Sequence, residues 1–500
     1  VLDVWPAMYD SRISEVASAL ATEASNLQAA NLWASTHDKS TSAQILLGLA
    51  CHWYLSGQFT RALEDVESAL NSETRQARRS ILLSLAARIE AYAENLDTAM
   101  ANAEAAAKDI DQLSTPPEQA WVLATQQLSY FMSARRDPTL MLPVAKRALN
   151  VAQQLGEAPA AVLAFETAAD GYCWNGQTAE GLSLQEEALR IARNSASSDL
   201  VDHAYGHAIY NLMLDPVSRG RRPASHVEEW TALTGASSSG SNLNSNDWLP
   251  WIYMQQGDLD GANRELEAIG GRKREGYNRT IYQLVSATVA WMRGDATQAS
   301  TAIAELGDRA ISERWWHVYY PLAAEIATER GDIAAARRTA DSYRRRDVHP
   351  AGQTAKLGVL MPLVRAEINM ALIDGARGES PGPSEILQEM RQLMIAHPPP
   401  TQASTSLLTP SQNIAFAEAE LTRLTGPEPD VWLIARHSAD YAYYRTYALM
   451  RMAEATLALG QQAEATELLQ NAFAEATHMR FAAIARSISR TAQRAGVRLE

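Results

Sequence analysis

Apolar residues recur along this chain in pairs of helical stretches, with a short polar turn inside each pair. An early example runs from about Ala43 to Leu70, with Gly57 at its turn. The second stretch of this pair places its apolar residues at i, i+3, i+4 and i+7, which gives a helix one apolar face. These residues are Phe59, Ala62, Leu63, Val66, Ala69 and Leu70. We therefore predict two antiparallel helices, with Gly57 in the left-handed conformation that ends the first helix.

The same unit returns every 37 residues in the middle of the chain, where a turn glycine is followed by alanine five residues later. The copies are Gly257 with Ala262, Gly294 with Ala299, and Gly331 with Ala336; related copies contain Glu94 with Ala99, Gly176, and Gly460 with Ala465. A single helix pair of this length cannot bury its own apolar face, whereas stacked copies can. The pattern predicts an all-α fold: a right-handed superhelical solenoid of antiparallel helix pairs. We expect one array over residues 1–500, with hinges near 234–247 and 396–411, where Ser/Gly/Asn-rich and Pro-rich runs interrupt the helices.

The bulk composition indicates a folded protein that neither crosses a membrane nor contacts nucleic acid. The chain is 46% hydrophobic, and no run of about 18 apolar residues marks a membrane span. Its formal net charge of −14 repels phosphate backbones. Only two cysteines occur, Cys51 and Cys173, and neither belongs to a metal or redox motif. This sparse usage suits a reducing compartment, so we predict a cytoplasmic location.

Candidate chemistry is scarce. The sequence has no nucleophile elbow, no local triad signature and no G-x-x-x-x-G-K-[ST] phosphate loop, so we expect no catalytic residues and no cofactor in this chain. His203 and His207 are four residues apart, a spacing that can hold zinc on one face of a helix, and Asp202 lies beside them. No third ligand is apparent, so we interpret them as surface or packing histidines and expect no metal.

Aromatic residues are the more informative class, because the chain has 12 Trp and 17 Tyr against 6 Phe. Tryptophan and tyrosine are favoured at binding surfaces, although single rings more often fill cores. Consecutive rings at Trp315-Trp316 and Tyr319-Tyr320 cannot all face one side of a helix, which favours a groove-facing role for some. Two arginines near these rings are candidates to pair with an anionic group. The predicted ligand- or partner-binding residues are Trp248, Trp251, Tyr253, Arg279, Tyr282, Arg314, Trp315, Trp316, Tyr319 and Tyr320.

Helix pairs joined by Gly-Asp or Gly-Gln turns, with alanine five residues on, resemble tetratricopeptide repeats, whose standard length is shorter, about 34 residues. Residues 441–500 also resemble the last repeats of the large ATP-binding LuxR-type (signal-transduction ATPase) transcription regulators. The matching positions are Tyr444, Tyr447, Ala448, Arg451, Ala453, Glu454, Ala455, Leu457, Ala458 and Gly460, then Ala492, Arg494, Ala495, Val497 and Leu499. This resemblance implies a repeat arm whose ATPase and DNA-binding modules lie outside this chain, with ATP bound only in a flanking domain.

The sequence therefore predicts a sensor and protein-interaction arm of a bacterial transcription regulator. A protein or small-molecule effector would occupy its concave surface and control the flanking modules, and self-association is a further open possibility. Two alternatives remain. One is a free-standing tetratricopeptide-type scaffold that docks partner peptides, and the other is the repeat arm of a nucleotide-cyclase signalling protein. The sequence flanking Val1 and Glu500 distinguishes them.

Overall fold

The computed structural model describes residues 13–499, except for 74, 109, 114, 133–137, 196–197, 215–221, 235–248, 271–275, 308–314, 347–349, 376–380 and 398–406. Within these residues every regular element is a helix, which confirms the all-α prediction. The helices are α2 (Ile13–His37), α3 (Lys39–Leu55), α4 (Phe59–Ser72), α5 (Gln76–Tyr92), α6 (Leu96–Ala107), η1 (Ile110–Gln112), α7 (Pro116–Met132), α8 (Pro138–Leu155), α9 (Ala160–Trp174), α10 (Thr178–Asn194), α11 (Ser198–Leu214), α12 (Arg222–Thr234), α13 (Leu249–Gln256), α14 (Leu259–Gly270), α15 (Gly276–Met292), α16 (Ala296–Leu306), α17 (Trp316–Glu329), α18 (Ile333–Arg344), η4 (Pro350–Lys356), α19 (Leu357–Ile373), α20 (Pro381–Ala396), α21 (Pro410–Thr425), α22 (Pro429–Ser438), α23 (Ala442–Ala458), α24 (Gln462–His478) and α25 (Ala482–Ala495).

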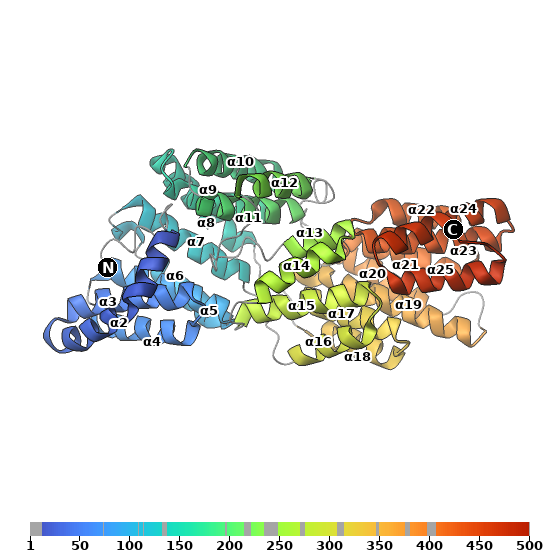
Figure 1. Ribbon diagram of the computed structural model, residues 1–500, viewed down its shortest axis with the longest axis horizontal. Coiled ribbons are helices and arrows are strands. Elements are labelled where there is room, and N and C mark those ends of the chain that lie inside the picture. Colours follow the sequence, from blue (N-terminus) through green and yellow to red (C-terminus); the bar gives the residue numbers. More distant parts are fainter. Residues whose placement is uncertain are drawn as a thin grey trace.

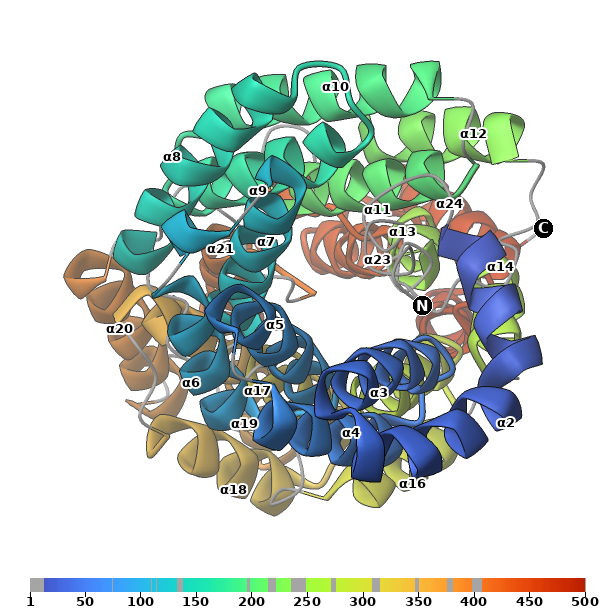
Figure 2. The same ribbon diagram turned by 90° about the vertical axis from the view of Figure 1, so that its left-hand side faces the viewer.

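Between α2 and α25 the helices form consecutive pairs, from α3/α4 to α23/α24, and the pairs coil about a common axis. Figure 1 shows the earlier pairs in one half of the elongated molecule and α13–α25 in the other. Viewed along the axis from the N-terminal side, the chain turns clockwise as it recedes, which makes the superhelix right-handed (Figure 2). Figure 2 also shows that the first helices, such as α5, α9 and α11, lie on the inner side of the coil, and that the second helices lie outside.

The predicted turn glycines are confirmed. Six of them lie between the two helices of a pair with φ between 72° and 87°: Gly57, Gly176, Gly257, Gly294, Gly331 and Gly460. At the first, the N–H of Gln58 donates to the carbonyl of Trp53 (2.8 Å) and that of Gly57 to the carbonyl of Tyr54 (3.0 Å). This is the Schellman arrangement, which satisfies the last carbonyls of a helix and reverses the chain.

Six of the turns are followed, five residues later, by a buried alanine. All six predicted positions have no exposed surface: Ala62, Ala99, Ala262, Ala299, Ala336 and Ala465. A side chain of this size lets neighbouring helices approach closely. The burial confirms the repeat register that the sequence predicts.

Successive turns of the superhelix touch each other. Helix α5 contacts α15, and α13 contacts α23, in each case five helix pairs further along the chain. Two contacts originate at the turn residues that adopt a left-handed φ without being glycine, Glu94 (68°) and Arg480 (60°). The Glu94 carboxylate accepts hydrogen bonds from Trp315 Nε1 (2.8 Å) and Thr280 Oγ1 (3.3 Å), and Arg480 pairs with Asp260 at 2.8 Å. The turns therefore close the pairs and also connect one superhelical layer to the next.

The two predicted hinges fall largely outside the described residues, at 235–248 and 398–406. Among the helices that the structure describes, none combines the length and the apolar character that a membrane crossing requires.

Candidate functional site

The aromatic residues proposed as a binding surface lie on or beside first helices, but most of their rings are in the core. Trp248 and Arg314 fall outside the described residues. Tyr253 and Tyr282 are half-buried, and Arg279 is exposed. The buried members are Trp251, Trp315, Trp316, Tyr319 and Tyr320. The expectation that some of the consecutive rings in α17 face an open groove is therefore not met in this structure.

The aromatic rings at the start of α17 are buried on two sides, because α18 packs on one side and the preceding superhelical turn lies on the other. The guanidinium of Arg346, just after α18, lies over the Trp316 ring at 4.7 Å, and its Nε donates to the Tyr320 hydroxyl at 3.1 Å. The Tyr320 ring also stacks on Tyr343 of α18. On another side, Trp315 donates to Glu94 of the preceding superhelical turn. The periodicity of one helix does not reveal this second layer, which is why the sequence favoured a groove.

A different set of side chains gathers on the inner helices of the N-terminal half. We call Arg88, Glu166, Asp170, His203 and His207 the inner-wall cluster. Helix α5 supplies the arginine, α9 the two carboxylates and α11 the two imidazoles. His203 Nδ1 lies 2.9 Å from Glu166 Oε2, and His207 Nδ1 lies 3.2 Å from Asp170 Oδ2. The two imidazole rings are 4.8 Å apart.

The members of the cluster differ in burial: Glu166 forms its buried floor, and His203 and His207 form its partly exposed rim. The side chain of Glu166 is 1% exposed, whereas those of His203 and His207 are 29% and 37% exposed. Burial raises the pKa of Glu166, but the adjacent imidazoles outweigh it and hold that pKa below its usual value. Burial lowers the pKa of His207, but Glu166 and Asp170 more than compensate and raise it to about 9. The result is a partly solvated set of charges above a buried carboxylate.

The floor is anchored by its own contacts. The Arg88 Nε donates to Thr125 Oγ1 of α7 at 2.9 Å, and the guanidinium lies over the Trp121 ring at 4.0 Å. Asn211 of α11 donates to Asp170 at 2.9 Å. Four successive first helices, α5 to α11, thus contribute to one polar surface.

Sequence reasoning noted the spacing of His203 and His207 but interpreted them as surface or packing histidines, and it missed Glu166 and Asp170. The signal was the repeat interval itself, because Glu166 precedes His203, and Asp170 precedes His207, by 37 residues. Residues one interval apart occupy the same position in adjacent repeats, so they lie side by side on the inner wall. A search for titratable residues 37 positions apart would therefore have identified the Glu166–His203 and Asp170–His207 pairs.

A second polar set is buried among the first helices of the C-terminal half. We call Glu325, Arg365, Glu420, Tyr444, Tyr447 and Arg451 the C-terminal ion network. Arg365 of α19 pairs with Glu325 of α17, and Tyr444 of α23 donates to Glu325 at 2.8 Å. Tyr447 donates to Glu420 of α21, and Arg451 Nε donates to the Tyr447 hydroxyl at 3.0 Å. The network joins four neighbouring repeats in the interior.

The charges of this network are balanced within it. Burial raises the pKa of Glu420, but the guanidinium groups of Arg423, Arg451 and Arg365 outweigh burial and keep that pKa below its usual value. For Glu325 burial dominates, and its pKa is raised despite Arg365. All its members except the partly exposed Arg451 are buried, so we interpret the network as structural and not as a binding surface.

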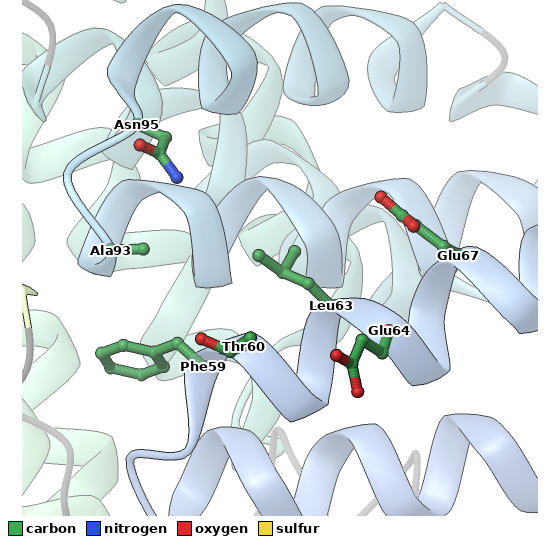
Figure 3. Close-up of a pocket in the computed structure, with 7 residues that line it drawn as sticks. All are labelled: Phe59, Thr60, Leu63, Glu64, Glu67, Ala93 and Asn95. Atoms are coloured by element: carbon green, nitrogen blue, oxygen red, sulfur yellow. The ribbon is translucent and has the colours of Figure 1, made fainter.

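A hollow of about 370 Å³ lies between α4 and the turn that precedes α6, and Figure 3 shows the residues that line it. Phe59, Leu63 and Ala93 provide its apolar lining, and the exposed carboxylates of Glu64 and Glu67 lie beside it. The hollow belongs to the outer helices. Its polar lining residues, Thr60, Glu64, Glu67 and Asn95, include no cationic group. The inner-wall cluster combines carboxylates with imidazoles and a guanidinium, so the inner wall is the better candidate site.

No protein-family model matches the chain, and no curated protein matches it. Among solved structures, the chain is similar to a Rap protein complexed with competence and sporulation factor. The identity is 13%, over 61% of this chain and 84% of that chain, with a TM-score of 0.44. It is also similar to a circular tandem repeat protein with a novel repeat topology, at 13% identity over 94% of this chain and 95% of that chain, with a TM-score of 0.12. Likenesses this weak carry no functional argument.

Proposed function

We propose that this chain is a sensor and interaction arm of a bacterial regulator, and that its inner wall binds a protein or small-molecule effector. The observation that carries the proposal is the inner-wall cluster. Partly exposed His203 and His207 and the largely buried Asp170 converge on first helices above a fully buried carboxylate. Convergent polar groups on a concave surface are typical of sites that fix the orientation of a ligand.

The position of the cluster also suggests how binding is transmitted. Arg88 lies on α5, six residues before Glu94, whose carboxylate contacts the next superhelical turn. An effector that draws α5 toward α9 moves this contact as well. Small rotations per repeat sum along a solenoid, so a local change at the inner wall alters the spacing of the whole coil. Such a response requires that the effector bind one spacing more tightly than the other.

The regulator context rests on the resemblance of residues 441–500. Four of the matching residues, Tyr444, Tyr447, Arg451 and Glu454, take part in buried or half-buried contacts that hold the last repeats together. Their packing role suits any long array of this type, which keeps the free-standing scaffold and the cyclase arm as the competing proposals. In each case the chain binds and transmits without catalysis, works in the cytoplasm and leaves nucleic-acid contact to other modules.

Native mass spectrometry of the full chain purified from its own host would identify a bound effector, whose affinity is then measured against variants. We expect Asp170→Asn to raise the dissociation constant by about tenfold or more, as loss of a central polar contact does. Asp97→Asn is the matched control, because Asp97 is exposed on the outer helix α6. Equal affinities for wild type and Asp170→Asn, or equal losses in both variants, would refute an inner-wall site.

The flanking gene sequence tests the regulator context separately. A phosphate-binding loop upstream and a helix-turn-helix downstream support the proposed arm. A cyclase catalytic domain, or stop signals on both sides, would replace it by one of the alternatives.

A further inference from the structure

The inner-wall cluster contains a set of donors suited to a metal ion. Glu166, His203 and His207 each place one ligand atom within 4.8 Å of the others. Although His203 Nδ1 is close to Glu166, neither carboxylate oxygen accepts a hydrogen bond of good geometry from the residues that the structure describes. A buried carboxylate without a well-aligned donor is costly unless a cation lies beside it, either a protonated imidazole or a metal ion that replaces the imidazole proton. We propose that Glu166, His203 and His207 bind a divalent transition-metal ion of the Zn²⁺ class between α9 and α11.

The type and arrangement of the donors support this class of ion. Imidazole nitrogen combined with carboxylate oxygen is a ligand set for Zn²⁺, whereas Ca²⁺ and Mg²⁺ prefer oxygen alone. His203 and His207 are one helical turn apart, so both rings lie on the face of α11 that meets α9. Ligands of a tetrahedral zinc ion lie about 3.4 Å apart, given bond lengths of about 2.1 Å. Rotation of the partly exposed imidazole side chains would bring the ligand atoms from within 4.8 Å of one another to this separation.

The surroundings of the three ligands fit a metal centre as well. His207 Nδ1 lies within hydrogen-bond distance of Asp170, which is itself held by Asn211. A carboxylate behind a ligating histidine fixes the ring and its tautomer and is a common feature of zinc sites. Glu166 and Asp170 carry two negative charges, and Arg88 supplies one positive charge from α5. When both imidazoles are neutral, as metal ligands must be, these groups leave one net negative charge for the bound cation.

Such an ion would join adjacent repeats and would keep a place for an incoming ligand. Three protein ligands leave one position of a tetrahedral ion open. Helices α9 and α11 both lie on the inner side of the coil (Figure 2), so that position belongs to the inner wall. A carboxylate, imidazole or water could occupy it. The site stands independently of the proposed effector binding, because metal uptake is measured without any effector.

The test uses the full chain after dialysis against a chelator. Zn²⁺ alone is titrated by calorimetry, and Co²⁺ alone by its visible absorption, which reports the ligand geometry directly. We expect one equivalent of either ion to bind, and a Co²⁺ spectrum distinct from that of the hydrated ion. His203→Gln should abolish the spectral change, and Asp170→Asn should weaken binding by about 10- to 100-fold.

His226→Gln is the matched control, because His226 belongs to the neighbouring helix α12 and pairs with Glu186 outside the cluster. It should retain full Co²⁺ binding. Should Glu166→Gln fail to fold, the half-exposed His203 provides the decisive variant. Equal uptake by wild type and His203→Gln, or no spectral change in wild type, would show that the cluster contains only two histidine–carboxylate pairs.

Discussion

At the residue scale, the smallest side chains determine how closely the helices cross. Six turns are followed by an alanine that has no exposed surface, from Ala62 in the first pair to Ala465 in the last. Protein interiors are packed as densely as organic crystals, so added volume at such a point must displace a helix. The repeat thus depends on the absence of larger side chains as much as on the presence of apolar ones.

Ala299→Leu is expected to destabilise the chain by about 1–3 kcal/mol through overpacking. Ala304→Leu in the same helix, α16, is the control because Ala304 is exposed. Urea denaturation of both variants measures the difference. A midpoint for Ala299→Leu that matches the wild type would mean that this alanine is not a crossing point.

The buried rings of α17 make a second residue-scale prediction. Trp316 fills the space beneath Arg346, so Trp316→Ala leaves a cavity and removes a cation–π contact. We expect a loss of about 3–5 kcal/mol in the free energy of unfolding. The melting temperature and the affinity for the effector should both fall. If the melting temperature is unchanged but effector binding is lost, the Trp316 ring belongs to a ligand site and not to the core.

At the element scale, buried charge links the first helices of the C-terminal half. Glu420 of α21 has a fully buried side chain and faces the guanidinium groups of Arg423, Arg451 and Arg365. Removing one charged side chain from a buried ion pair leaves its partner buried without a compensating charge. The network therefore favours one particular arrangement of neighbouring helices.

Glu420→Gln should cost about 3–5 kcal/mol near neutral pH. The pKa of Glu420 is lower in the folded chain than the usual 4.5, so its contribution is present above that pH and is lost as the pH falls through the folded value. The stability difference between wild type and variant should therefore shrink below about pH 4.5. Denaturation at several pH values tests this, with Glu418→Gln as control because the Glu418–Arg391 pair is largely solvated. A difference that does not change with pH would contradict the assigned ion pairs.

The turns also differ from one another, although the sequence makes them look equivalent. Gly294 and Gly331 both have left-handed φ, at 77° and 72°. A Cβ at Gly331 would meet nothing within 4 Å, whereas one at Gly294 would lie 2.7 Å from the backbone nitrogen of Ala483 in α25. One turn is exposed, and the other supports the next layer.

Gly331→Ala should therefore cost only the left-handed conformation, about 1–2 kcal/mol. Gly294→Ala should cost that amount and about 1–3 kcal/mol more, because α25 must move away. Hydrogen exchange should show faster opening of α25 in the Gly294 variant alone. Identical behaviour of the two variants would exclude the contact between layers.

At the scale of the whole molecule, polar side chains at two turns connect successive turns of the superhelix. Glu94 connects α5 to Thr280 and Trp315, while Arg480 connects the last repeats to Asp260. These polar contacts are partly solvated, whereas Trp291 of α15 packs against Tyr443 of α23 with both rings buried.

Glu94→Gly isolates this effect, because glycine adopts the left-handed φ of 68° without strain while the carboxylate contacts disappear. We expect a larger radius of gyration by small-angle X-ray scattering, with unchanged helicity by circular dichroism. Glu64→Ala on the outer helix α4 is the control. Scattering curves that coincide with the wild type would show that the layers are held together by other contacts.

The sequence by itself determined the helix pairs, their register and their turns. Gly57, Gly294 and Ala299 could be placed from spacing alone, because a turn glycine and a crossing alanine are local requirements that recur at each repeat. The histidines of the candidate site were visible for the same reason, since a spacing of four residues places side chains on one helical face.

Only the tertiary structure decided what lies against each face. It buried Trp315 and Trp316 together, because the coil returns and covers the second side of α17. It brought Glu166 to His203 across two helices, and it set Glu94 against Trp315 across a full superhelical turn. Periodicity describes one helix and its repeat, whereas burial and charge pairing here depend on neighbours 37 residues, or five helix pairs, away along the chain.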